Sequence, residues 1–136
     1  ANGHLYYNLG NAYDALGLYD KAIGSYDKAV KFQPDFAEAY LNMGLVYNKK
    51  KDFENAILQV KRSIDFQPDS FKAHNNLGNA LFALGQLATA ELSFHESIRL
   101  DPGIADYYGN LGRLLQHLRR WSESEAAYRK ALNLRA

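Results

Sequence analysis

The sequence predicts an all-α protein built from four consecutive helix-turn-helix repeats. Residues 3–136 of the 136-residue sequence fall into four rows, which cover 3–36, 37–70, 71–104 and 105–136 and share residue types at eight fixed offsets. The shared apolar offsets are three or four residues apart, which is the spacing of one face of an α-helix. A proline also stands at the same offset near the end of three rows, where it would stop a helix.

The first helix of each row is defined by offsets 4, 7, 8 and 11, counted from the first residue of the row. These offsets differ by three, one and three, so their side chains share one helical face. The glycine at offset 8 would let the two helices of a row cross closely. The residues at these offsets are Tyr6, Leu9, Gly10 and Tyr13, then Tyr40, Met43, Gly44 and Tyr47, then His74, Leu77, Gly78 and Leu81, and finally Tyr108, Leu111, Gly112 and Leu115.

The second helix follows a tight turn and is defined by offsets 20, 24 and 27. In row one these are Ala22, Tyr26 and Ala29, and the other rows carry similar residues. The turn residue of each row would adopt a left-handed conformation, which glycine tolerates and which costs other residues ~1 kcal/mol. The turn residues are Gly17, Lys51, Gly85 and Arg119, and the closing prolines are Pro34, Pro68 and Pro102.

These columns resemble those of the tetratricopeptide repeat (TPR) family over residues 3–136. The resemblance implies a single array in which the repeats stack as a right-handed superhelical solenoid of eight helices, with no separate capping helix. It also implies that the first helices line a concave groove and the second helices form the convex back. A TPR array is a non-catalytic scaffold for protein binding, so the resemblance implies a protein or peptide ligand.

The composition restricts the function classes. Sixteen Lys and Arg residues against 15 Asp and Glu residues give a formal charge of +1, which is not the strongly basic balance of a nucleic-acid-binding domain. The absence of Cys excludes disulfides and thiolate chemistry, and no apolar run is long enough for a membrane span. We therefore expect an intracellular protein that uses no metal or other cofactor, binds neither nucleic acid nor membrane, and has no enzyme activity of its own.

Offset 6 is Asn in every row, which makes a ladder along the predicted groove. Asn is a mediocre helix former, so helix propensity does not explain four of them. Each amide carries donors and an acceptor and could bond the main chain of an extended peptide. The ladder is similar to the asparagine ladder in the repeat arm of O-linked N-acetylglucosamine transferases. In the alternative interpretation, these amides bond only their neighbours within the protein. The ladder consists of Asn8, Asn42, Asn76 and Asn110.

Other predicted groove positions would orient the peptide or contact its apolar side chains. The polar candidates are Asn11, Asn79, Lys72 and Arg113, and the apolar candidates are Tyr7, Leu41, Leu45 and Phe82. Asn11, Asn42 and Lys72 also resemble part of the carboxylate clamp of repeat proteins that bind chaperone tails. Two cations of that clamp are replaced here by Tyr7 and Asn76, so the resemblance to the clamp is partial.

Two alternatives remain open from the sequence. Row four has no successor to cover Tyr128, Leu132 and Leu134, which predicts end-to-end or swapped self-association and hence a self-assembling structural module. The segment could also be a docking or regulatory arm excised from a larger enzyme. Row four is the basic end of the chain, with six cations against three acids.

Overall fold

Residues 2–135 are described by a computed structural model, and within them the chain forms eight α-helices and no strand. The predicted all-α fold of four helix-turn-helix repeats is therefore confirmed. The helices are α1 (Asn2–Ala15), α2 (Tyr19–Phe32), α3 (Ala37–Lys49), α4 (Phe53–Phe66), α5 (Phe71–Ala83), α6 (Leu87–Leu100), α7 (Ala105–His117) and α8 (Trp121–Arg135). None of these helices is long and apolar enough to cross a lipid bilayer.

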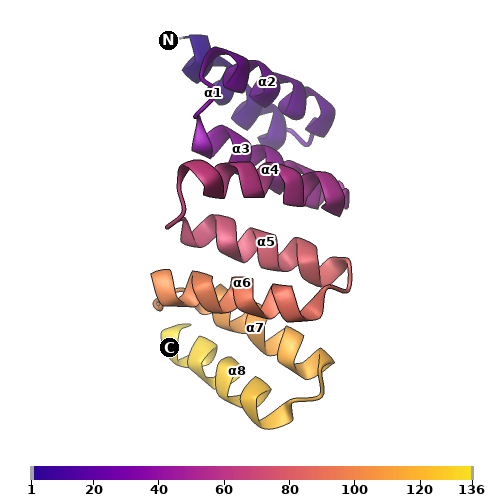
Figure 1. Cartoon of the computed structure of the whole chain (residues 1–136), viewed down its shortest axis with the longest axis vertical. Helices are drawn as coiled ribbons and strands as arrows, with labels where there is room; N and C mark the ends of the chain where they lie inside the picture. The colour runs from indigo at the N-terminus through magenta and orange to yellow at the C-terminus, as the bar shows by residue number, and fades with distance from the viewer. Residues whose placement is uncertain (1, 136) are drawn as a thin grey trace. The chain divides into compact units, whose positions relative to one another are not determined.

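The helices belong to two compact units, and each unit contains two repeats. The first unit ends at Pro68 and holds α1 to α4, and the second begins at Asp69 and holds α5 to α8. In both units the two helices of a repeat run antiparallel and pack closely, as the pairs α1 and α2 or α7 and α8 show in Figure 1. The second helix of one repeat then packs against the first helix of the next, α2 against α3 and α6 against α7.

The close crossing inside each hairpin depends on the glycine at offset 8. A Cβ atom placed on Gly44 would lie 2.4 Å from Val60 Cγ2, and one placed on Gly10 would lie 2.6 Å from the ring of Tyr26. Neither separation is tolerated between carbon atoms, so a larger residue would force the two helices apart. Tyr26 and Val60 fill the space that the glycines leave, and both are fully buried.

Stacking of the repeats in the first unit buries an apolar core between α2 and α3. Ala22 and Tyr26 pack against Met43 and Val46, and Ala29 packs near Phe36 and Ala39. All of these side chains are buried. The residues of α3 that cover α2 stand at offsets 3, 7 and 10 of their row, which identifies the positions that join one repeat to the preceding one.

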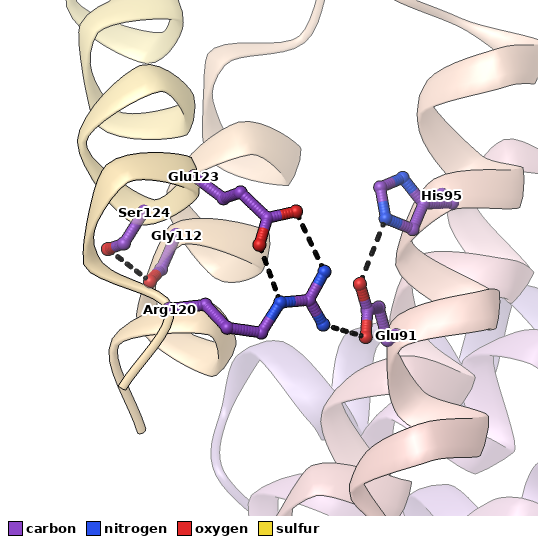
Figure 2. Close-up of polar contacts among 6 residues, drawn as sticks. All are labelled: Glu91, His95, Gly112, Arg120, Glu123 and Ser124. Carbon is purple, nitrogen blue, oxygen red and sulfur yellow. Dashed lines mark hydrogen bonds and ion pairs between the residues drawn. The ribbon is translucent and has the colours of Figure 1, made fainter. Parts of the chain in front are cut away.

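In the second unit, polar contacts add to the packing of α6, α7 and α8. Figure 2 shows Arg120, just before α8, between Glu91 on α6 and Glu123 on α8. Its guanidinium donates to Glu123 at 2.6 and 2.8 Å and to Glu91 at 2.7 Å. These hydrogen bonds raise the pKa of Arg120 and lower that of Glu123, so both groups stay charged. On the other side of α8, the Ser124 hydroxyl donates to the carbonyl of Gly112 at 2.8 Å (Figure 2).

The turns between paired helices are left-handed, as predicted. Gly17 and Gly85 have φ angles of 75° and 79°, and the non-glycine residues Lys51 and Arg119 have φ angles of 62° and 60°. The Cβ atom of an L-residue crowds the backbone in this conformation. The turns of the second and fourth repeats are therefore strained where those of the first and third are not.

We expect Lys51→Gly to raise the free energy of unfolding by about 0.5–1 kcal/mol, because glycine adopts a positive φ without that crowding. Urea unfolding followed by circular dichroism measures the change. Lys51→Ala is the matched control, since it removes the same charge but keeps the Cβ atom. If Lys51→Ala stabilises the protein as much as Lys51→Gly does, the gain comes from charge and not from the backbone.

Candidate functional site

The predicted binding residues lie on the first helices of the repeats. In the first unit they are on α1 and α3, and in the second unit on α5 and α7. On α1 they are Tyr7, Asn8 and Asn11, on α3 Leu41, Asn42 and Leu45, on α5 Lys72, Asn76, Asn79 and Phe82, and on α7 Asn110 and Arg113. Each unit thus presents one face of paired first helices, and the two faces differ in chemistry.

In the first unit, an amide network joins α1, α2 and α3. The Tyr26 hydroxyl donates to Asn11 Oδ1 at 2.6 Å, and Asn42 Nδ2 donates to the same oxygen at 2.9 Å. Asn42 Nδ2 also donates to the Tyr7 hydroxyl oxygen at 3.0 Å. Burial raises the pKa of the Tyr26 hydroxyl above its ordinary value, and the negative charge of Asp14 raises it further, so this hydroxyl stays a donor.

This network uses both N–H donors of Asn42 and both lone pairs of the Asn11 oxygen. The alternative in which the ladder bonds its own neighbours therefore applies to Asn42. What remains for a ligand at this point is an acceptor, the Asn42 carbonyl oxygen, and a donor, the Asn11 amino group. Asn8, the first member of the ladder, is exposed on α1.

In the second unit, the equivalent amides are arranged differently. Asn110 Nδ2 donates to Asn75 Oδ1 at 3.1 Å, and Asn75 is buried. Asn79 stands at the same offset as Asn11, but its Oδ1 is buried without a hydrogen-bond partner. It lacks both donors that Asn11 receives, because Phe94 replaces Tyr26 at offset 24 and supplies no hydroxyl, and because Asn110 donates to Asn75 instead. Asn75 was not among the predicted binding residues, and its position directly before the ladder residue Asn76 is the signal that could have identified it.

The second unit also presents cations beside aromatic rings. The guanidinium of Arg113 lies over the ring of Phe82, 5.6 Å from its centre, and the His117 ring meets Phe82 edge-on at the same separation. Neither Arg113 nor Lys72 makes an ion pair within the described chain. A hollow of about 730 Å³ opens at this place, lined by Phe82, Arg113, Gln116, His117, Arg119 and Trp121.

The remaining predicted residues of the first unit's face are less accessible to a ligand. Leu41 is only 8% exposed and offers little surface to a ligand, whereas Leu45 is half-buried. On the first unit's face, Lys49 is already neutralised by Asp14 at 2.8 Å. The open cationic surface therefore belongs to the second unit. Within residues 2–135, no three His, Asp or Glu side chains come close enough together to hold a metal ion.

We expect Phe94→Tyr to raise the free energy of unfolding by about 0.5–1.5 kcal/mol, because the added hydroxyl would donate to the unpartnered Asn79 Oδ1 as Tyr26 does to Asn11. Thermal and urea unfolding measure the gain. Tyr26→Phe is the matched control and should destabilise the first unit by a similar amount. A loss of stability in Phe94→Tyr would show that the hydroxyl cannot reach that oxygen.

We expect Asn42→Ala to lower the free energy of unfolding by about 1–3 kcal/mol, because it leaves the partly buried Asn11 and Tyr7 groups short of a partner. Asn8→Ala changes the same repeat offset at an exposed position and should stay within about 0.5 kcal/mol of the unaltered protein. Equal stability of the two variants would contradict a structural role for the Asn42 amide.

Comparisons with known proteins agree with this geometry. The TPR repeat model matches residues 10–50 and 44–85, and tetratricopeptide repeat models match residues 71–104 and 104–136. No curated protein shows significant sequence similarity to the chain.

Several solved structures have the same fold. The crystal structure of MamA has 25% sequence identity and a TM-score of 0.92, with 98% of this chain and 78% of that chain covered. MamA from Desulfovibrio magneticus RS-1 has 24% identity and a TM-score of 0.91, covering 98% and 75%. The first TPR of Spaghetti (RPAP3), bound to the HSP90 peptide SRMEEVD, has 25% identity and a TM-score of 0.85, covering 87% and 94%.

The matched models together cover most of the sequence, and the paired helices, glycine crossings and left-handed turns are those that the repeat columns predict. The chain belongs to the tetratricopeptide repeat family, whose members are in general non-enzymatic protein-interaction modules.

Proposed function

We propose that the chain binds an extended peptide segment on its first-helix faces and prefers a peptide with acidic side chains. The observation that carries the proposal is the face of the second unit, where Arg113 and Lys72 make no ion pair with any residue from 2 to 135 and a hollow lined by aromatic rings opens beside Arg113. Cations without a carboxylate partner in their own protein are suited to a carboxylate from another chain.

The amides would hold the main chain of the peptide. The Asn110 carbonyl oxygen makes no hydrogen bond within residues 2–135, and its orientation is fixed by the bond from its Nδ2 to Asn75. In the first unit, the Asn42 oxygen is fixed in the same way by the bonds from its Nδ2 to Tyr7 and Asn11. Both oxygens would accept hydrogen bonds from backbone N–H groups of the peptide. These two amides would therefore bind the peptide through their oxygens, because their Nδ2 groups are already bonded within the protein.

The cations would select acidic side chains. Arg113 is exposed and sits over the Phe82 ring, which holds its guanidinium in place, and Arg119 lines the same hollow. Phe82, His117 and Trp121 add surface for an apolar neighbour of the acidic residue. A carboxylate bound here gains a charge-assisted hydrogen bond and excludes water against the aromatic rings.

The TPR domain of Spaghetti (RPAP3) supports this class of ligand, because the peptide in its structure, SRMEEVD, is acidic. This chain has Tyr7 and Asn76 where the carboxylate clamp has cations, and its Asn11 and Asn42 amides are partly committed to each other. We therefore place the acidic contact at Arg113 in the second unit and not at a clamp for a terminal carboxylate.

We expect Arg113→Ala to weaken the binding of an acidic peptide about tenfold to a hundredfold, because a hydrogen bond to a charged group contributes about 1.5–3 kcal/mol. The probes are fluorescein-labelled SRMEEVD and its uncharged counterpart SRMQQVN, measured by fluorescence anisotropy. The unaltered chain should prefer the acidic probe, and the preference should decrease as salt is added.

The matched control is Arg62→Ala, which removes one exposed arginine from α4, outside the proposed face. It should leave both affinities unchanged. Equal binding of the two probes, or equal loss in Arg62→Ala and Arg113→Ala, would refute the assignment of the acidic contact to Arg113.

A further inference from the structure

A groove lies on the side of α7 that faces away from the predicted peptide face. Its floor consists of Tyr108, Leu111 and Leu115 at offsets 4, 7 and 11, whereas the peptide face of α7 uses offsets 6 and 9. Side chains of α6 and α8 form its two walls. The volume of this α6–α8 groove is about 340 Å³, within the range of about 300–1,000 Å³ that is common for binding sites. None of the residues assigned to the peptide lines it.

Three side chains that line the groove are smaller than their equivalents in the first unit. Leu115, Ala126 and Ala127 stand at offsets 11, 22 and 23 of their row. Gln59, at the offset of Ala127, is buried although it is polar, so its side chain takes up space that Ala127 leaves open. The equivalents of the three residues in the first unit are Tyr47, Leu58 and Gln59.

The opening of the groove does not depend on where the sequence begins or ends. Both of its walls belong to the second unit, α6 to the first repeat of that unit and α8 to the second. A following repeat would not cover the wall at Ala126, because Gly24 stands at the same offset in the first repeat and is exposed although a second repeat follows it.

The Tyr108 ring is held in place and has no aromatic neighbour within residues 2–135. Its hydroxyl donates to the carbonyl of Pro102 at 3.0 Å, as the hydroxyl of Tyr40 does to the equivalent proline. The Tyr40 ring also stacks on Phe66, with 6.0 Å between the ring centres. Leu134 replaces Phe66 at this offset of α8. Tyr108 therefore offers a fixed ring to an aromatic group of another molecule.

The unpaired charge at the rim of the groove is positive. Glu123 accepts two hydrogen bonds from Arg120, and His95 contacts Glu91 at 3.4 Å, as Figure 2 shows. Lys130, which also borders the groove, makes no ion pair with any residue from 2 to 135. A carboxylate on the occupant would therefore complement Lys130. An exposed ion pair contributes little, so apolar contact would supply most of the affinity and Lys130 would select among apolar partners.

We propose that the α6–α8 groove binds a segment of a partner protein in which an aromatic residue stands next to an acidic one. The aromatic side chain would lie against Tyr108 and over Leu111, and the carboxylate would pair with Lys130. The occupant is part of a protein because the groove is bordered by the exposed residues Ala126 and His95. Such a groove covers a side chain from one side, whereas sites for free small molecules enclose most of the ligand surface.

This site is separate from the face that carries the proposed function. The two lie on opposite sides of α7 and share no residue. The groove could therefore bind its partner while the first-helix face holds a different peptide, and either proposal can fail without the other.

The test follows the amide signals of the isotope-labelled chain by NMR during titration with the capped peptides GFDG, GFNG and GADG. The unaltered chain should bind GFDG, and the chemical shifts of Leu111, Ala126 and Ala127 should change. GADG lacks the ring and should bind at least about tenfold more weakly, because it buries much less apolar surface. GFNG lacks the charge and should bind about twofold to fivefold more weakly.

The groove-filling variant combines Ala126→Leu with Ala127→Gln, which are the residues of the first unit at these offsets. It should bind GFDG at least about tenfold more weakly. Ala88→Leu is the matched control, since it enlarges an exposed alanine of α6 that does not line the groove, and it should bind GFDG like the unaltered chain. Lys130→Ala should remove the preference for GFDG over GFNG, whereas Lys61→Ala on α4 should keep it.

Circular dichroism confirms that each variant is folded. Equal binding of GFDG and GADG, an unchanged affinity of the folded groove-filling variant, or chemical-shift changes confined to the residues around Arg113 would overturn the proposal. The last result would place the acidic peptide on the first-helix face and leave the proposed function intact. If the groove-filling variant does not fold, the three peptides on the unaltered chain still decide, because both their relative affinities and the positions of the shift changes are measured there.

Discussion

The close crossing of two helices at a glycine is the constraint on which the rest of the structure depends. Gly10 and Gly44 leave room for Tyr26 and Val60, and a single Cβ atom at either position would come within 2.6 Å of the facing side chain. Because the crossing fixes the rotation of the first helix, it decides which offsets are buried in the hairpin and which face a ligand. The same rotation brings offsets 3, 7 and 10 to the preceding repeat, so binding faces and stacking faces follow from one packing contact.

The hydrogen-bonding needs of partly buried amides limit how the asparagine ladder can function. A ladder of free amides would be costly, because a polar group shielded from water loses its solvent partners. In the first unit, Asn11 and Tyr7 accept from the two donors of Asn42 and so fix its carbonyl oxygen, and the Tyr26 hydroxyl donates to the second lone pair of the Asn11 oxygen. Internal satisfaction thus does not oppose ligand binding, since it orients the remaining acceptors before a ligand arrives. It does remove the possibility that each amide grips a peptide by both of its groups.

The sequence was sufficient to predict the four hairpins, because period, glycine spacing and proline positions are local signals that each repeat supplies again. It was also sufficient for the positive φ of Lys51 and Arg119, since the rows align them with Gly17 and Gly85. The hydrogen-bond partners of the asparagine amides could not be predicted from the sequence. Asn42 bonds both Tyr7 at offset 5 and Asn11 at offset 9, whereas Asn110 bonds Asn75 at offset 5, and these partners lie in the preceding repeat, far away in the sequence. Likewise, the sequence identified Arg120 only as one of the six cations of row four, and did not predict that it bonds both Glu91 and Glu123.

The repeats share a backbone plan but divide their chemistry between the two units. On the first-helix face of the first unit, Lys49 is paired with Asp14. In the second unit, Arg113 has no ion pair and the buried Asn79 oxygen has no hydrogen bond within residues 2–135. Buried polar groups without a partner are not confined to this face, since Gln59 Oε1 on α4 of the first unit also lacks a hydrogen bond within residues 2–135. What distinguishes the second unit's face is the exposed cation of Arg113 beside the aromatic rings. In the proposed complex, a carboxylate of the peptide would pair with Arg113, and a backbone N–H of the peptide would donate to the Asn110 oxygen, which the bond to Asn75 already orients.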